Sequence, residues 1–459
     1  MPAHEPVLRR AAELAEAFLA ELPERPVAPP ADVAALRAAL GRELQDGPLD
    51  PVAVIEDLAR DADPGLTASA GPRFHGFVIG GSLPVAVAAD WLVSAWDQCA
   101  GFYALSPAAS VVEEVAGGWV LELLGLPAGA SVGFVTGAQA GNVVGLAAAR
   151  HAVLARAGHD VERDGLQGAP PVRVVAGEQA HATVFTALRL LGLGAGTAAL
   201  VPADDAGRMR PDALAATLDA GDRDAPTIVI AQAGNVATGA FDPLEPITDL
   251  AREHGAWLHV DGAFGLWAAA APSRRHLTAG IERADSWAVD AHKWLNVPYD
   301  CAMAIVADPG AHRAAMGLAA AYLTTVGGTT DPTNLVPESS RRARAVPVYA
   351  ALRALGRDGV AELVERCCAH ARRFAELLGA RDDVEVLNDV VLNQVLLRFG
   401  DDDARTRAAV EAVQRDGTLW LGETTWDGRV AMRIAVSGWM TTEDDVERSA
   451  RAIAAAAGV

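Results

Sequence analysis

A lysine flanked by histidine and tryptophan is the residue in this sequence best suited to covalent chemistry. Lys293 lies in the segment Val289–Trp294, which reads Val-Asp-Ala-His-Lys-Trp and continues an apolar run. A lysine in apolar surroundings loses its proton more readily than a solvated one, and the neutral amine is a nucleophile. The alternative is a surface lysine that extends its charged end into water. Lys293 is therefore a candidate nucleophile that needs supporting residues.

Three further features precede this lysine, and each one alone has an ordinary structural explanation. The turn Val135–Asn142 has small residues that let backbone N–H groups approach an anion, although glycine suits any tight turn. His181 stands at an expected helix start, where a histidine is more often a cap. Asp261 ends the apolar run Trp257–Val260. A carboxylate buried there needs a cationic or hydrogen-bonding partner, unless it caps the next helix.

The order of these features along the chain indicates one cofactor. Pyridoxal 5'-phosphate (PLP) requires a phosphate-binding turn, a flat side chain, a carboxylate and a lysine, and here the lysine follows the carboxylate by 32 residues. The phosphate would lie on the helix N-terminus, and the aldehyde would condense with Lys293. Asp261 would keep the pyridine nitrogen protonated, so that the ring accepts electrons as a carbanion forms. The sequence thus predicts an amino-acid-processing enzyme.

Short apolar runs alternate with helical patterns around these residues and predict an α/β fold. The expected strands are Val132–Val135, Val172–Val175, Ala198–Val201, Thr227–Ala231, Trp257–Val260, Ser286–Val289 and Ala302–Val306. Continuous Val, Ile and Leu runs separated by helices are typical of a parallel sheet covered on both faces. Such sheets bind ligands beyond the carboxyl ends of their strands, which is where the candidate residues fall.

Three regions are expected along the chain. They are a helical N-terminal arm over residues 1–70, a large cofactor-binding domain over 71–345 and a small C-terminal α+β domain over 346–459. Residues 323–345 are polar and weakly periodic, which predicts a long loop, and a helix over Val348–Leu378 follows. Gly192, Gly194 and Gly196 follow a helix and precede a strand, the reverse of the dinucleotide-binding order, and are expected to form a turn.

Composition excludes several other classes of protein. The formal net charge of −21 disfavours nucleic acid and anionic membranes as partners, because their phosphates would be repelled. The four cysteines show no C-x-x-C spacing, so we expect packed thiols and no zinc or other metal site. A basic N-terminal flank followed by an apolar segment is missing, and no apolar run reaches the ~20 residues that span a bilayer. These features predict a cytoplasmic protein.

The chain resembles the group II PLP-dependent decarboxylases, the family of aromatic-amino-acid, glutamate, histidine and tyrosine decarboxylases. The matching segments are Glu24–Val27, Ser106–Ala108, Val135–Asn142, Gln179–His181, Gly239–Pro243, His259–Asp261, His292–Leu295, Asp300–Cys301 and Met432–Ile434. They extend over almost the whole chain, and the His-Lys-Trp block with its upstream aspartate is specific. The resemblance implies a fold-type-I PLP enzyme with a mostly parallel seven-stranded sheet. It also implies a homodimer whose active site lies at the subunit interface, where the N-terminal arm would pack.

The resemblance also implies a role for individual residues. Lys293 would form the Schiff base, and Asp261 would pair with the pyridinium nitrogen. His181 would stack on one face of the ring, and Ala263 would pack against the other. The residues expected at the phosphate are Ala138, Gln139, Ala140 and His292. Asn235 stands where the family usually has threonine, and we expect it near the ring or the substrate.

The implied reaction is decarboxylation of an L-amino acid through a Schiff base on Lys293 and a quinonoid intermediate. In the family, a tyrosine on a mobile loop usually protonates that intermediate. Here residues 323–345 contain no Tyr, Phe or His, and Tyr322 and Tyr349 lie just outside. Decarboxylation to an amine is the leading interpretation, with Tyr322 or His181 as possible acids. The alternatives are decarboxylation coupled to oxidative deamination, a PLP-dependent lyase reaction, and a non-catalytic PLP-binding protein.

The segment Arg73–Gly81 matches the part of the family that lines the substrate pocket. Phe77 and Ile79 within it, and Phe102 farther along, favour an aromatic or aliphatic amino acid over glutamate. A basic cluster beside the expected loop could bind an anion, although such clusters are usually solvated or paired across an interface. Its members are Arg341, Arg342 and Arg344.

Overall fold

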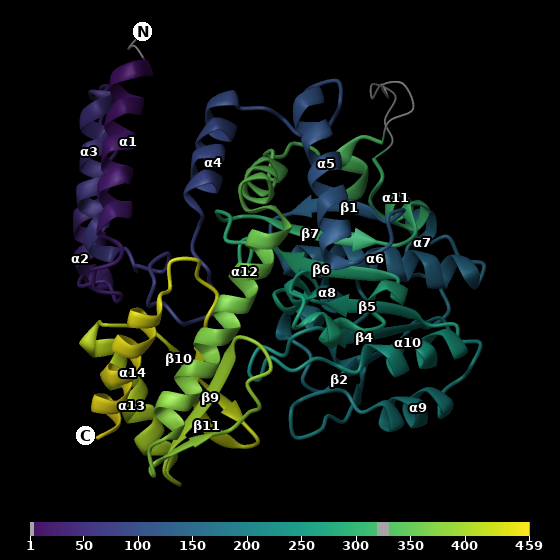
Figure 1. Cartoon of the computed structure of the whole chain (residues 1–459). Coiled ribbons are helices and arrows are strands. Elements are labelled where there is room, and N and C mark those ends of the chain that lie inside the picture. Colours follow the sequence, from purple (N-terminus) through teal and green to yellow (C-terminus); the bar gives the residue numbers. More distant parts are fainter. Residues whose placement is uncertain (1–3, 319–329, 459) are drawn as a thin grey trace.

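The central feature of the computed structural model, which describes residues 4–318 and 330–458, is a seven-stranded sheet (Figure 1). Its strands are β1 (Ser131–Val135), β2 (Arg173–Gly177), β3 (Ala199–Val201), β4 (Thr227–Gln232), β5 (Trp257–Asp261), β6 (Ser286–Asp290) and β7 (Ala302–Val306). They lie in the order β1-β7-β6-β5-β4-β2-β3. β7 runs antiparallel to both of its neighbours, and the other pairings are parallel. The expected mostly parallel α/β sheet is confirmed.

Helices cover both faces of this sheet, which explains its continuous apolar strands. α6 (Ala138–Arg156), α8 (Ala182–Leu190) and α11 (Pro309–Met316) pack on one face, where they meet Ile228 and Ile230 of β4. α5 (Pro107–Leu124), α9 (Pro211–Asp219) and α10 (Leu244–Glu253) pack on the other, which presents Val229 and Ala231 of the same strand. Because successive side chains alternate between two buried faces, every position of β4 must be buried.

The helix boundaries differ from expectation where glycines intervene. The helix expected from Gly141 begins at Ala138, because Gly137 takes the extended N-cap conformation directly before it. The helix expected over Val348–Leu378 is α12 (Ala345–Gly379), and it is interrupted at Gly356, whose φ is 62°. A positive φ carries little steric cost in glycine, so the chain bends there. Of the loop expected over 323–345, residues 330–344 are described and hold one short 3₁₀ turn, Pro332–Leu335.

A smaller antiparallel sheet forms the C-terminal part of the chain (yellow in Figure 1). Its strands are β8 (Val384–Val386), β9 (Gln394–Phe399), β10 (Gly422–Trp426) and β11 (Arg429–Ala435), in the order β10-β11-β9-β8. Helices α13 (Asp403–Asp416) and α14 (Glu443–Ala457) accompany it. The backbone of β11 bonds to the first half of the chain, since Ala435 N–H donates to His75 O.

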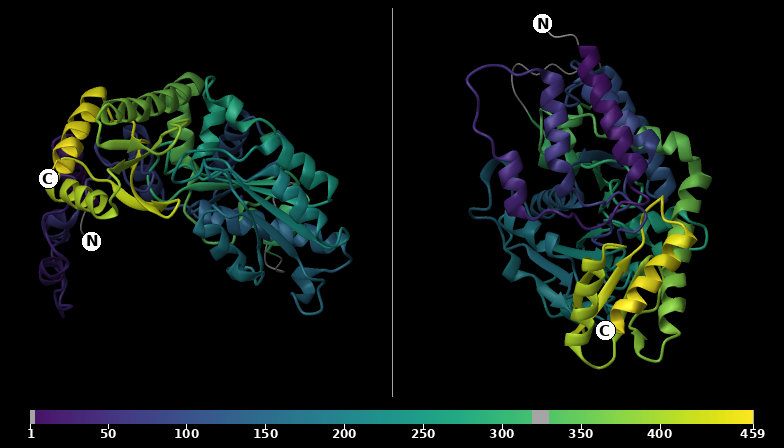
Figure 2. Two further views of the ribbon diagram at one scale, coloured as in Figure 1. Left: turned by 90° about the horizontal axis from the view of Figure 1, so that it is seen from below. Right: turned by 90° about the vertical axis from the view of Figure 1, so that its left-hand side faces the viewer.

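Three N-terminal helices stand to one side of the body (purple in Figures 1 and 2). They are α1 (His4–Glu21), α2 (Val33–Leu40) and α3 (Pro51–Ala62), and α4 (Pro84–Trp96) follows them. None of the residues described in α1, α2 and α3 is buried, although they include exposed apolar side chains such as Leu8 and Leu58. Packing of this arm on a second subunit stays a prediction.

Within residues 4–318 and 330–458, every helix is too short or too polar to span a lipid bilayer.

The three arginines of the basic cluster after the loop all form ion pairs within the chain, and only Arg342 is substantially exposed, with 38% of its side chain accessible. Arg341 is buried, and its guanidinium forms two contacts of 2.8 and 2.9 Å with the carboxylate of Glu113 on α5. The other two arginines also pair within the chain: Arg342 with Asp90 at 2.6 Å and Arg344 with Asp300 at 2.9 Å. The expectation of solvated arginines is wrong for Arg341 and Arg344, because the loop folds back onto the body of the chain, and pairing across a subunit interface stays a prediction. The expected packed thiols are confirmed for three of the four cysteines, Cys301, Cys367 and Cys368, which are buried.

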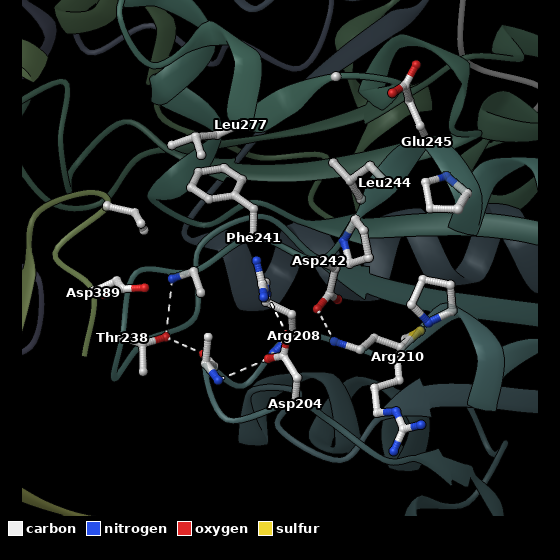
Figure 3. Close-up of a pocket in the computed structure, with 18 of the residues that line it drawn as sticks. Asp204, Arg208, Arg210, Thr238, Phe241, Asp242, Leu244, Glu245, Leu277 and Asp389 are labelled. Atoms are coloured by element: carbon white, nitrogen blue, oxygen red, sulfur yellow. Dashed lines mark hydrogen bonds and ion pairs between the residues drawn. The ribbon is translucent and has the colours of Figure 1, made fainter. Parts of the chain in front are cut away.

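A buried carboxylate fastens the end of β4 to the loop before α9. Asp242 lines a cavity of about 550 Å³. Figure 3 shows this residue among the other side chains of the cavity wall. Its two oxygens accept the backbone N–H groups of Met209 and Gln232, both at 2.7 Å. Burial raises the pKa of Asp242 to about 6, and the two N–H groups oppose this rise. Asp242 therefore supports the strand end where the candidate site lies.

Replacing Asp242 with alanine should lower the free energy of unfolding by about 2–5 kcal/mol, because each of two buried N–H groups loses its acceptor at ~1–3 kcal/mol. Its folded-state pKa of about 6 exceeds the ordinary 3.8. This group's contribution to stability is therefore full below pH ~4 and is lost as the pH rises through ~6. Chemical unfolding at pH 4, 5 and 7 checks both effects, with Asp242→Asn as a control that keeps one acceptor. Equal stability of Asp242→Ala and wild type would contradict this role.

Candidate active site

A cavity of about 430 Å³ lies beyond the carboxyl ends of β4, β5 and β6. The N-terminal ends of α6 and α8 and a residue of β11 complete its walls. Eight of the expected site residues line it: Phe77, Ala138, Gln139, His181, Asp261, Ala263, His292 and Lys293. These residues come from distant parts of the chain, and the parallel strands bring them together because their carboxyl ends share one edge of the sheet.

Lys293 is held by a buried carboxylate that was not expected to have a role. Its Nζ lies 2.8 Å from Oδ2 of Asp290, and Asp290 is 2% exposed. The other oxygen, Oδ1, accepts the backbone N–H of Ala138 at 2.6 Å. The alternative of a surface lysine reaching into water is therefore wrong. Asp290 closes the apolar strand β6 as Asp261 closes β5, so the signal that identified Asp261 could also have identified Asp290.

Asp261 has the hydrogen-bonding partners that its burial requires. Its Oδ2 accepts from Nδ2 of Asn142 at 3.1 Å, and its Oδ1 accepts the backbone N–H of Ala263 at 3.1 Å. The second bond closes a turn within residues 261–263 and does not cap a helix, because the next helical turn, Gly265–Ala270, has Phe264 as its N-cap and no side-chain cap. The interpretation of Asp261 as a helix cap is therefore wrong, and its carboxylate lines the cavity.

His181 is both the N-cap of α8 and part of the cavity wall. Its Nδ1 accepts the N–H of Thr183 at 3.3 Å and lies 2.7 Å from the hydroxyl of the same residue. Burial lowers the pKa of His181, while the nearby carboxylate of Asp261 acts to raise it. The cap fixes the imidazole orientation, so a flat side chain is held at the cavity before any ligand binds.

The first turn of α6 offers backbone donors, but the donor of Ala138 is already used. That N–H donates to Asp290, whereas no hydrogen bond among the described residues takes up the N–H of Gln139 or Ala140. Ala140 is not a lining residue, so only its backbone could serve a phosphate. Nδ1 of His292 accepts the N–H of Cys301 at 3.2 Å. Burial lowers the pKa of His292, so the neutral ring carries its proton on Nε2 and can donate it.

Besides Ala140, three further expected site residues do not line this cavity: Asn235, Phe102 and Ile79. Asn235 turns into its own loop, where its Oδ1 accepts the N–H groups of Ala237 at 2.8 Å and Thr238 at 3.2 Å. A role for the Asn235 side chain in cofactor binding is therefore not supported. Phe102 belongs to a turn bonded to residues 331–333, and Ile79 follows a turn that directs Phe77 into the cavity instead.

Arg433 lines the cavity although the sequence indicated it only as part of a matching segment. It reaches the cavity from β11 of the small sheet, and its Nη1 donates to Val236 O at 2.9 Å. Burial lowers the pKa of Arg433. Thr183, Gln232 and Phe264 also line the cavity without having been expected there. The position of Arg433 depends on how the two sheets meet, so no local pattern reveals it, whereas Gln232 ends β4 as Asp261 ends β5 and could have been found by the same signal.

The chemistry of this donor set fits PLP. The cavity lies within the ~300–1,000 Å³ that small-molecule sites occupy. It presents a lysine amine for an aldehyde, an acceptor-only carboxylate for a pyridinium nitrogen and a fixed imidazole for a ring face. The unused N–H groups at the start of α6 and the Nε2 proton of His292 suit a phosphate. Lys293, Asp261, His181, Ala263, Gln139, Ala140 and His292 are thus the residues that would hold the cofactor.

Comparison with known proteins gives a consistent picture. The family model described as "Pyridoxal-dependent decarboxylase conserved domain" matches residues 34–399. The L-2,4-diaminobutyrate decarboxylase of Rhizobium meliloti (strain 1021) is 32% identical over 385 residues, which cover 81% of this chain and 75% of that protein. The 4-hydroxyphenylacetaldehyde synthase of Rhodiola rosea is 26% identical over 418 residues, covering 87% and 84%. A crystal structure of Oryza sativa TDC with PLP and tryptamine is similar with a TM-score of 0.92 and 26% identity, covering 100% and 99% of the two chains.

Proposed function

Because the chain belongs to the family of pyridoxal-dependent decarboxylases, we propose that it removes the carboxyl group of an L-amino acid with an aromatic or other apolar side chain. PLP is its cofactor. The observation that carries the proposal is the convergence of Lys293, Asp261 and His181 on one cavity. A chain that kept only the fold would need neither the amine nor the buried carboxylate there.

Each residue of the cavity has a task in this proposal. Bound PLP supplies a ring that takes up the electron pair left when CO₂ departs. Lys293 Nζ would hold the cofactor covalently and, once released, would return to Oδ2 of Asp290. The carboxylate of Asp261 would pair with the protonated pyridine nitrogen and keep the proton there. Both of its oxygens already accept hydrogen bonds, which hold the carboxylate in one orientation. His181 and Ala263 would keep the ring in one plane between them.

The preference for an apolar substrate rests on one wall of the cavity. Phe77, Val78 and Phe264 lie there, and Phe77 also stacks on Trp420 with ring centroids 5.2 Å apart. Phe77 and Val78 have φ of 52° and 61°, which costs roughly 1–2 kcal/mol per residue in an L-amino acid. The fold holds this turn against that strain, as is common at ligand sites. Arg433 is the cation on the wall that would meet the carboxylate of the amino acid.

Aldehyde formation is the second candidate reaction, and the sequence of the loop favours it. Residues 323–345 contain no tyrosine, and Tyr322 lies outside the described residues. Tyr349 does not line the cavity and stacks on Trp119 with ring centroids 5.0 Å apart. Without a well-placed acid, a carbanion lives longer and can react with oxygen. A similar protein is an aldehyde synthase by name.

One assay separates these outcomes. The purified protein is loaded with PLP and given L-tryptophan, L-tyrosine, L-phenylalanine, L-leucine or L-glutamate, while CO₂, amine, ammonia and peroxide are measured in parallel. We expect CO₂ and amine in equal amounts from an apolar amino acid. Peroxide and ammonia equal to CO₂ would establish the aldehyde-forming reaction instead, and preference for glutamate would refute the substrate class. No CO₂ from any amino acid would leave a PLP-binding protein.

We also propose that two copies assemble into a homodimer with this site near their interface. The support is the exposed apolar surface of the N-terminal helices and of α4, where Trp91, Leu92 and Trp96 are each more than 40% exposed. Sedimentation velocity of the full chain should give a mass of two chains. A monomer with full activity would refute this assembly.

A further inference from the structure

Four buried polar side chains lie behind Asp261, on the side away from the cavity. They are Asn142 of α6, Trp257 and His259 of β5, and Ser286 of β6, and none is more than 5% exposed. A buried polar group is costly unless it is hydrogen-bonded, so four of them in one place need a reason. Neither the cofactor site nor the packing of the sheet explains why they are polar.

The four side chains form one continuous line of hydrogen bonds. Nε1 of Trp257 donates to Oγ of Ser286 at 2.9 Å. Oγ of Ser286 lies 2.8 Å from Nδ1 of His259, and Nε2 of His259 lies 2.9 Å from Oδ1 of Asn142. Nδ2 of Asn142 lies 3.1 Å from Oδ2 of Asp261. The line therefore runs from the tryptophan on β5 to the carboxylate in the cavity wall.

The groups at both ends of this line require the same donor-to-acceptor direction along it. The Asp261 carboxylate has no hydrogen to offer, so Asn142 must face it with the NH₂ group and turn its Oδ1 to His259. Nε2 of His259 then carries the proton, and Nδ1 accepts from the hydroxyl of Ser286. That hydroxyl can accept from Trp257, whose indole is only a donor. In every hydrogen bond of the line, the donor thus lies on the side of Trp257 and the acceptor on the side of Asp261.

The surroundings of His259 keep the ring neutral and in place. Burial lowers the pKa of His259 to about 3, so its two nitrogens stay one donor and one acceptor. Gly145 of α6 lies directly against the ring. A Cβ at that position would come within 2.7 Å of Cε1 and 2.8 Å of Nδ1. The absence of a side chain at Gly145 lets α6 approach closely enough for Asn142 to reach His259.

We propose that Trp257, Ser286, His259 and Asn142 are a hydrogen-bond chain of one direction that orients the Asp261 carboxylate toward the pyridine nitrogen of PLP. The inference rests on the proposed role of Asp261. The last donor fixes Oδ2, and the N–H of Ala263 fixes Oδ1, so the carboxylate cannot rotate away from the ring. Polarised along one direction, the successive bonds strengthen one another and stabilise the negative charge. His259 is therefore a positioning residue, which acts on the cofactor through Asn142 and Asp261.

The test compares PLP with an analogue that has C–H in place of the ring nitrogen. Full-length wild type, His259→Phe, Ser286→Ala and Asp261→Ala are freed of cofactor, and the Kd of each compound is measured by fluorescence titration. A hydrogen bond to a charged group corresponds to about 10–100-fold in affinity. We expect His259→Phe to weaken PLP binding about tenfold and Ser286→Ala about threefold. Binding of the analogue should change less than twofold in both variants.

The outcomes distinguish this inference from the proposed function. One outcome is that Asp261→Ala weakens only PLP binding while His259→Phe affects both compounds equally. In that case the hydrogen-bonded side chains behind Asp261 have only a structural role, and the role of Asp261 itself stands. If Asp261→Ala also affects both compounds equally, the proposed pairing with the ring nitrogen fails. Thermal melting of the cofactor-free variants shows whether each one folds. Should His259→Phe not fold, the selective loss in Ser286→Ala decides the matter.

Discussion

Replacing Lys293 with alanine is expected to lower the rate of CO₂ release by ~10⁴-fold or more, the upper end of what one positioned proton-transfer group contributes. The loss should be large because, in the proposed function, the amine would form the covalent link to the cofactor and would also be available as a base beside it. Its Nζ is already positioned, at 2.8 Å from Asp290. Single-turnover release of CO₂ from PLP-loaded protein measures the effect directly.

Two controls separate the chemistry of Lys293 from its charge. Lys293→Arg keeps a cation beside Asp290 but removes the nucleophile, and it should be as inactive as Lys293→Ala while melting closer to wild type. The visible absorbance of the bound cofactor should change in both variants, since neither can hold PLP covalently. Wild-type spectra and turnover in Lys293→Ala would refute the assignment, and another lysine is hard to invoke because the chain has no other.

Replacing Asp261 with asparagine is the second large effect, expected to lower kcat by about 10²–10³-fold. An adjacent opposite charge commonly shifts a pKa by ~1–3 units, so removing the carboxylate should lower the pKa of the pyridine nitrogen by a similar amount. The unprotonated ring accepts electrons less well. Asp261 is 5% exposed, so water cannot screen its charge as it would at the surface.

The pH profile gives this prediction a second readout. In the variant the nitrogen would be protonated only at lower pH, so the residual kcat should rise as the pH falls, whereas wild type should show no such rise. Asp249→Asn is a matched control, because Asp249 is an exposed carboxylate on α10 whose one ion pair among residues 4–318 and 330–458 is with Arg283. A loss below threefold in Asp261→Asn, or the same pH profile as wild type, would exclude the proposed pairing.

Both effects concern residues that the sequence alone identified, and the reason is local. Asp261 ends β5 and Lys293 follows β6, and the continuous apolar residues of both strands reveal them, since β5 and β6 are buried on both faces. Parallel strands end at one edge, so the order of residues along the chain already implied that they meet. The same reasoning predicted the seven strands and the turn before α6.

The partners of these residues could not be predicted in this way. Asp290 was seen as part of a motif, but its bonds to Ala138 and Lys293 depend on how closely α6 approaches β6. Asn235 looked like a cofactor residue, yet its side chain bonds to the N–H groups of its own turn. Arg433 meets the cavity only because the small sheet packs against the large one.

What the sequence by itself determined is the kind of chemistry: an amine, a carboxylate and a flat ring in an order that suits PLP, on an α/β sheet. Residue type and strand periodicity are properties of short segments, so they can be read without coordinates. Only the tertiary structure decided which atoms meet, from the pairing of Arg341 with Glu113 to the chain through His259. Hydrogen bonds and ion pairs act over about 3 Å, and that precision arises only when distant segments pack against one another.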